Sequence, residues 1–136
     1  MAKELIQAKD GKLSFGDFTL PEKAKLDGFE SGGNLYKVKT FRELTKLERD
    51  GMFVYESEPG SDVVDFYQTT DSLQFGVTGA EDTMITVGLK EDFWYEVSEN
   101  DKSVGKMKTN LGGKLSFSVS LSPDAVTSIK ITETNG

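Results

Sequence analysis

Alternation of apolar and polar residues is the feature of this sequence that most constrains its fold. Within the stretch Val87–Leu121, the odd-numbered residues of 93–97 and 115–121 are apolar, and most of their neighbours are polar. A period of two gives a strand one apolar and one solvated face, which is typical of a half-buried antiparallel sheet. Polar segments at 99–102 and 110–113 contain Asn and Gly, which tight turns favour. The stretch therefore predicts three strands joined by two consecutive hairpins.

The same pattern extends over the rest of the C-terminal half. Further strands are expected at 63–68, 73–77 and 84–89, and Ile129 and Ile131 belong to a last one. About seven short strands at near-regular spacing indicate an all-β fold, an antiparallel β-sandwich of immunoglobulin-like type. The predicted core is the odd-numbered apolar set Leu73, Phe75, Val77, Ile85, Val87, Leu89, Phe93, Tyr95, Val97, Leu115, Phe117, Val119, Leu121, Ile129 and Ile131.

The N-terminal part predicts a layer of β-hairpins. Asp10-Gly11 indicates a tight turn between two short strands, and apolar parity then changes at Gly16, which indicates a bulge or bend. Residues 21–25 are expected to form a polar connection. Residues 31–34 are expected to form a flexible loop before a strand at 35–41.

Residues 40–51 allow two interpretations. As a helix, they have a Thr-x-x-Glu capping box, an apolar stripe over about two turns and a terminal glycine. As a hairpin, they have an Asp50-Gly51 turn that places Leu47 opposite Val54. The hairpin is preferred because so short a helix is marginal by itself.

A chain of 136 residues is long enough for one domain that buries a real core. The Pro-Gly turn at 58–62 is its strongest internal break. We expect a single domain, 1–136, with an N-terminal β-hairpin layer (1–58) and a β-sandwich module (59–136).

Composition excludes several classes of function. The 23 acidic and 16 basic residues give a net charge of −7, which argues against nucleic acid and anionic membranes as partners. Cysteine and histidine are both absent, which excludes thiol chemistry, Ser-His-Asp catalysis and the usual zinc sites. No apolar run has the length of a membrane-spanning helix and no signal-peptide pattern is present. A cytoplasmic location is therefore expected, with no cofactor and no metal.

Two resemblances extend this interpretation. The segment 89–97, LKEDFWYEV, resembles the Leu-x-Pro-x-Thr-x-Tyr-x-Val segment of fibronectin type III domains, with Glu91 in place of Pro and Phe93 in place of Thr. The resemblance implies a sandwich in which Tyr95 makes a corner hydrogen bond.

Over the whole length, the motifs KVKTF, TKLERDGMFVYESEPGSDV, GAEDT and VGKMKTNLGGKLS resemble a group of short acidic bacterial proteins that carry the label endosialidase. That label implies an enzyme acting on polysaccharides. Sialidases hold the sialic carboxylate with three arginines, whereas Arg42 and Arg49 are the arginines here, so no catalytic residue is carried over.

Trp94 is the single tryptophan, and its parity places it opposite Phe93 and Tyr95, on the outward face. Together with Glu96 it forms the candidate binding site, because an aromatic platform beside a carboxylate can stack on a sugar ring or anchor a protein. The alternative is that the N-terminal layer covers Trp94, since tryptophan is highly buried on average.

Acidic residues offer further candidates. Four acids surround the Pro-Gly turn, namely Glu56, Glu58, Asp62 and Asp65. They lack EF-hand spacing, so a solvated turn is favoured over a calcium site. Glu96 with Asp101, or Glu56 with Asp65, could serve as the paired carboxylates of a glycosidase.

The sequence favours a non-catalytic β-sandwich module that binds a glycan or protein partner or associates with itself. Homo-oligomers are plausible because the edges of an open sandwich invite strand pairing. The alternative is a polysaccharide-acting glycoside hydrolase of endosialidase type that uses paired carboxylates.

Overall fold

The computed structural model describes residues 4–135, and it confirms the predicted antiparallel β-sandwich. These residues form strands β1 to β13 and connecting loops. None of them belongs to a helix, and so none belongs to a helix long and apolar enough to cross a membrane. All strand pairs are antiparallel.

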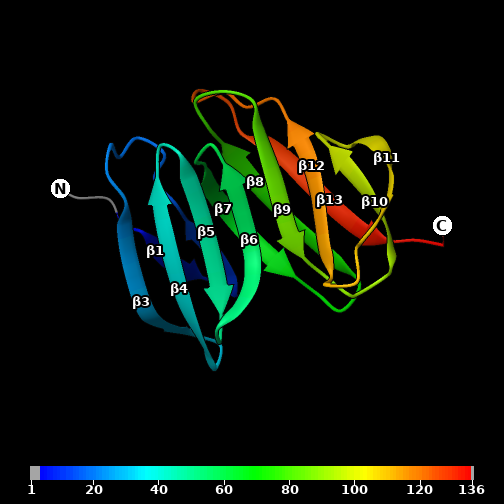
Figure 1. Ribbon diagram of the computed structural model, residues 1–136, viewed down its shortest axis with the longest axis horizontal. Coiled ribbons are helices and arrows are strands. Elements are labelled where there is room, and N and C mark those ends of the chain that lie inside the picture. The colour runs from blue at the N-terminus through cyan, green and yellow to red at the C-terminus, as the bar shows by residue number, and fades with distance from the viewer. Residues whose placement is uncertain (1–3, 136) are drawn as a thin grey trace.

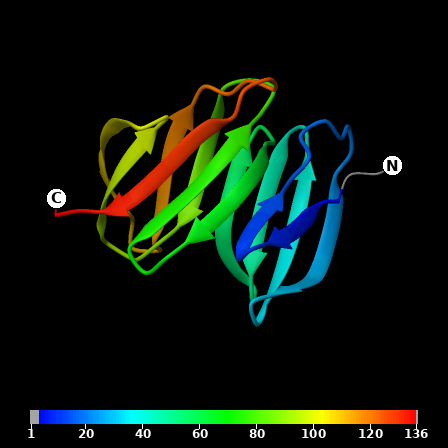
Figure 2. The same ribbon diagram turned by 180° about the vertical axis from the view of Figure 1, so that it is seen from behind.

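Two sheets make up the sandwich. The seven-stranded sheet has the order β1 (Ile6–Lys9), β2 (Lys12–Phe15), β7 (Asp62–Gln68), β8 (Ser72–Thr78), β13 (Thr127–Glu133), β10 (Trp94–Glu99) and β11 (Lys102–Lys108). The six-stranded sheet has the order β12 (Lys114–Val119), β9 (Thr83–Gly88), β6 (Met52–Glu58), β5 (Leu44–Arg49), β4 (Asn34–Phe41) and β3 (Ala24–Ser31). The six-stranded sheet faces the viewer in Figure 1, and the seven-stranded sheet does so in Figure 2.

The core lies between the sheets and contains thirteen of the fifteen predicted residues. The exceptions are Leu89, which is partly buried, and Phe93, which is 40% exposed. Both lie between the end of β9 at Gly88 and the start of β10 at Trp94, where the chain crosses from one sheet to the other. Alternation cannot predict which side chains point into the core there, because no strand pairing fixes their direction.

The predicted Asp-Gly hairpin turns are confirmed. Asp50 and Gly51 have φ values of 51° and 79°, which a two-residue hairpin turn requires, so residues 40–51 contain a hairpin and no helix. Leu47 lies opposite Tyr55, and its predicted pairing with Val54 is wrong. A bulge between Leu47 and Glu48 shifts the register there.

Two other predictions about strands need correction. The second of the two consecutive hairpins does not exist, because β11 and β12 belong to different sheets and residues 110–113 cross between them. The polar connection at 21–25 runs into β3, an edge strand that the sequence did not predict. Its exposed residues and its register shift between Leu26 and Phe29 weaken the alternation there.

The crossover from β6 to β7 contains the Pro-Gly turn at 58–62 and is fixed by buried hydroxyl groups. Thr45 Oγ1 donates to the Ser61 carbonyl at 2.8 Å and accepts from the Ser61 N–H at 3.0 Å. Ser61 Oγ lies 2.8 Å from Tyr55 Oη and 2.6 Å from Ser57 Oγ, and Thr40 Oγ1 lies 2.8 Å from Thr45 Oγ1. In residues 4–135, no buried side-chain nitrogen or oxygen lacks a hydrogen-bond partner. This hydroxyl cluster is therefore a satisfied structural network.

Alkaline pH should destabilise the fold through Tyr55. Burial raises the pKa of its hydroxyl far above the ordinary value of 10. The unfolded chain therefore releases this proton above a pH of about 10 while the folded chain retains it, which costs about 1.4 kcal/mol of stability per pH unit. Urea unfolding between a pH of about 9 and about 11 checks this, because Tyr55→Phe should lose stability less steeply than the wild type. Parallel losses in the two proteins would contradict the assignment to Tyr55.

Candidate functional site

Trp94 lies on the outer face of the seven-stranded sheet, as its alternation predicts. Its strand is held between β13 and β11, and its neighbour Tyr95 points into the core. Trp94 is 38% exposed. The alternative that the N-terminal layer covers it is wrong, because β1 and β2 lie at the opposite edge of the sheet (Figure 2) and β3 to β6 belong to the other sheet. An exposed indole on a strand paired along both sides is available for stacking.

Polar groups surround this indole. Lys108 lies opposite Trp94 on β11, with Nζ 6.0 Å from the ring centroid, which is within reach of a cation–π interaction. The same ammonium pairs with Asp92 at 3.1 Å. Glu96 is partly exposed and accepts a hydrogen bond from Ser103 Oγ at 3.2 Å. The sheet thus brings an aromatic ring, a carboxylate and an ammonium group onto one face.

A hollow of about 470 Å³ lies at one end of the sandwich, where turns from both sheets meet. Its walls come from the β5–β6 turn, the β7–β8 loop and the β9–β10 loop, together with Tyr95. Cationic and acidic side chains both line it: Arg49, Lys90, Lys114, Asp50, Asp71 and Glu91. The mixture gives the hollow no single sign of charge.

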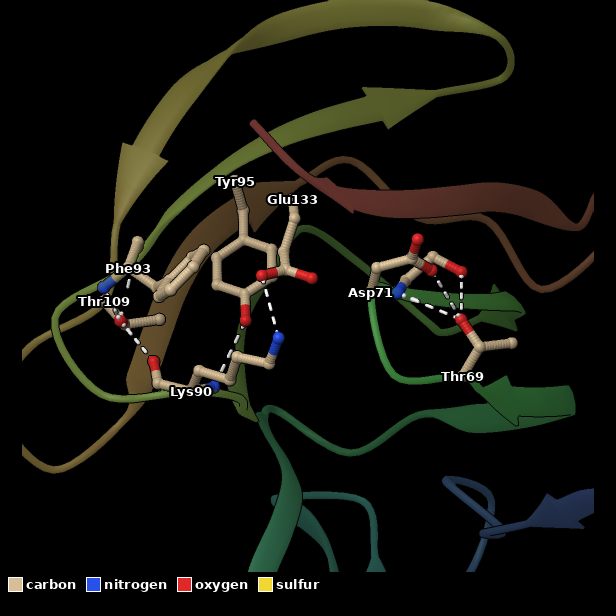
Figure 3. Close-up of polar contacts among 8 residues, drawn as sticks. Thr69, Asp71, Lys90, Phe93, Tyr95, Thr109 and Glu133 are labelled. Carbon is tan, nitrogen blue, oxygen red and sulfur yellow. Dashed lines mark hydrogen bonds and ion pairs between the residues drawn. The ribbon is translucent and has the colours of Figure 1, made fainter. Parts of the chain in front are cut away.

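The polar groups beside this hollow bind one another (Figure 3). Lys90 Nζ lies 2.8 Å from Glu133 Oε1, and the Lys90 N–H donates to Tyr95 Oη at 3.2 Å. Thr109 Oγ1 donates to the Lys90 carbonyl at 2.6 Å and accepts from the Phe93 N–H at 2.9 Å. The hydrogen bond with Glu133 raises the pKa of Lys90, and burial raises the pKa of Tyr95. Lys90 therefore stays charged and Tyr95 stays protonated near neutral pH, so neither is a general base there.

Of the two hypothesised carboxylate pairs, one lies on two different sheets and the other lies within one hairpin. Glu56 points outward from the six-stranded sheet, whereas Asp65 is exposed on the seven-stranded sheet. The sheets alone are about 10 Å apart, and glycosidase carboxylates are at most about 9.5 Å apart, so this pair cannot act together. Glu96 and Asp101 share the β10–β11 hairpin, with Glu96 on the strand and Asp101 in the turn.

The acids around the Pro-Gly turn do not converge. Asp62 accepts a hydrogen bond from the Phe18 N–H at 2.9 Å, and Glu58 is exposed at the end of β6. Among residues 4–135, no group of three or more acidic side chains could hold a metal ion.

The sequence reasoning missed a positively charged area on the outer side of the six-stranded sheet. We call it the lysine face, and it consists of Lys23, Lys25, Lys37, Lys39 and Lys46 on or beside β3, β4 and β5. The alternation in Lys23-Ala-Lys25 and Lys37-Val-Lys39 was the available signal, since a period of two puts both lysines of each pair on one side of a strand.

Comparison with known proteins gives no match: no protein-family model, no curated protein and no solved structure is similar to this chain. The corner hydrogen bond that the fibronectin type III resemblance implied is present between Lys90 and Tyr95. Immunoglobulin-type domains have seven to nine strands, whereas residues 4–135 of this chain form thirteen. Because no known protein matches, both the fibronectin type III and the endosialidase resemblance stay predictions.

Proposed function

We propose that the protein is a non-catalytic β-sandwich module that binds a glycan or protein partner through the outer face around Trp94 and Glu96. The observation that carries this proposal is the 38% exposure of the single tryptophan on a strand with partners along both edges. Such a strand holds the ring in place before binding, so little conformational entropy is lost when a ligand stacks on it.

The chemistry beside the ring supports a polar partner. Glu96 can accept hydrogen bonds from ligand hydroxyl groups, and the Lys108 ammonium can donate them. Self-association is compatible with this role. β12 is a sheet edge that keeps a regular register with β9, whereas β11 at the edge of the other sheet is bulged and rich in lysine.

The fluorescence of Trp94 tests the proposal because no other tryptophan contributes. In the free protein, acrylamide should quench Trp94 readily. Addition of a glycan from a panel of soluble laminarin, xyloglucan and polysialic acid should shift its emission and protect it from acrylamide. Trp94→Ala should bind that glycan about tenfold more weakly, since truncating an aromatic residue at the centre of an interface commonly costs more than about 1 kcal/mol.

The matched control is Tyr67→Ala, because Tyr67 is 40% exposed on the same sheet but lies on β7, away from β10. Its affinity for the bound glycan should equal that of the wild type. Lack of any glycan-dependent change in Trp94 fluorescence would contradict glycan binding at this face.

The same panel distinguishes this binding module from the alternative, a glycoside hydrolase of endosialidase type. A binding module leaves the chain length of polysialic acid unchanged after prolonged incubation, whereas an endosialidase shortens it. Cleavage by purified protein that is abolished in Glu96→Gln would replace the present proposal with the enzyme.

A further inference from the structure

We propose that the lysine face binds an acidic polysaccharide, one that carries carboxylate or sulfate groups along its chain. This surface lies on the six-stranded sheet, on the side of the sandwich opposite Trp94 (Figures 1 and 2). The inference goes beyond the proposed function and rests on different residues, so one can fail while the other holds.

The register of the sheet places three lysines side by side. Lys25 on β3 lies directly opposite Lys39 on β4, and Lys39 lies directly opposite Lys46 on β5. Neighbouring strands are about 4.8 Å apart, so the three side chains form a row about 10 Å long across the sheet. Lys37 lies two residues from Lys39 on the same side of β4. Lys23 lies beside this row, with Nζ 5.8 Å from the centroid of the outward Phe41 ring.

Like charges directly opposite each other destabilise a sheet, so this arrangement costs stability. The neighbouring lysines lower the pKa of Lys39, with Lys37 having the largest effect and Lys25 the next. Glu48, on the same strand as Lys46, lies opposite Lys37, and Glu56 on β6 lies opposite Lys46. In residues 4–135, ion pairs join Lys90 to Glu133 and Lys108 to Asp92, and none includes a member of the lysine face.

The concentration of charge is unusual for this chain. Five of its 16 basic residues belong to the lysine face, although the protein carries a net charge of −7. A row of unpaired ammonium groups on a rigid sheet is complementary to an anion with repeated charges. Basic patches formed by contiguous Lys- and Arg-rich segments bind heparin and nucleic acids, and this row concentrates the same kind of charge by strand pairing.

The surrounding surface favours a polysaccharide over a protein or a nucleic acid. Cores of protein interfaces are enriched in aromatic residues and arginine and depleted of lysine, whereas this row consists of lysine. Single-stranded nucleic acids stack on aromatic side chains, but Phe41 is the nearby outward ring and Lys23 lies over it. A duplex needs a broad basic surface, about 600 Å² or more even for a single module, whereas Glu48 and Glu56 border this row.

The test measures binding of polygalacturonate, heparin and neutral dextran to the full chain by titration calorimetry. We expect polygalacturonate or heparin to bind and dextran not to bind. The two acidic polymers distinguish carboxylate from sulfate as the preferred group. About three charge contacts predict that affinity falls on the order of tenfold between about 50 and about 200 mM salt.

The variant Lys25→Gln/Lys39→Gln/Lys46→Gln should bind at least about tenfold more weakly and lose this salt dependence. Its melting temperature should equal or exceed that of the wild type, because the like-charge pairs are gone. The matched control Lys9→Gln/Lys12→Gln/Lys130→Gln removes the same charge from the seven-stranded sheet and should bind as the wild type does.

Three results would overturn the proposal. The first is that neither acidic polymer binds at low salt, and the second is that the two triple variants bind equally well. The third is that oligothymidylate or polyglutamate binds the lysine face while both acidic polysaccharides fail, which would assign the face to a nucleic acid or an acidic protein.

Discussion

Replacing Gly60 with alanine is expected to destabilise the protein by about 3 kcal/mol, the upper end of the usual cost of overpacking, because the added atom would meet fixed backbone. A Cβ atom at this position would lie 2.0 Å from the carbonyl oxygen of Phe41. The backbone has little freedom to move away. The Gly60 N–H donates to the Arg42 carbonyl at 3.0 Å, and Ser61 next to it is bonded twice to Thr45.

The measurement is thermal unfolding, in which Gly60→Ala should melt at least about 10 °C below the wild type. Gly112→Ala is the matched control, because its Cβ would meet only Asn110 Oδ1, at 3.4 Å, in an exposed loop. An unchanged melting temperature for Gly60→Ala would mean that the crossover between β6 and β7 can shift. The lysine face depends on this crossover, since Gly60 packs against the turn that joins β4 to β5.

Local signals predicted the strands that alternate strongly and the turns that need positive φ. Asp50-Gly51 was recognised as a turn because this dipeptide adopts the conformation that a two-residue hairpin requires. β3 was missed because an exposed edge strand with a bulge has no clear apolar face.

Residues 110–113 contain the same turn residues as a hairpin. They nevertheless join two sheets, because Thr109 and Asn110 bond to the β9–β10 loop at Phe93 and Asp92. The sheet that a strand joins depends on contacts distant in sequence, and local turn residues do not determine it.

The two candidate sites also differ in how far the sequence alone could predict them. Parity alone was sufficient to place Trp94 on the outer face, since its neighbours on β10 alternate cleanly. The row of Lys25, Lys39 and Lys46 depends on the pairing of three strands, of which β3 was not predicted and β5 was one of two interpretations of residues 40–51. Net charge also concealed it, because a total of −7 averages over faces of opposite sign.

Truncating Tyr55 to alanine is expected to cost about 3–5 kcal/mol, the range measured for large aromatic residues in cores. Tyr55 belongs to the six-stranded sheet, and its ring makes edge contacts with three rings of the seven-stranded sheet. The centroids of Phe15, Phe75 and Phe66 lie 5.4, 5.6 and 6.3 Å from its own. Its hydroxyl also anchors Ser61, so the substitution opens a cavity between the sheets and releases the crossover.

Urea unfolding of three variants separates these contributions. Tyr55→Phe keeps the ring and loses the hydrogen bond, so it should cost about 1–2 kcal/mol, well below the cost of Tyr55→Ala. Tyr67→Ala removes an exposed tyrosine of the outer face and should stay within about 0.5 kcal/mol of the wild type. If Tyr55→Ala were no less stable than Tyr67→Ala, Tyr55 would not join the two sheets. The rigidity that both proposed binding faces require would then need another source.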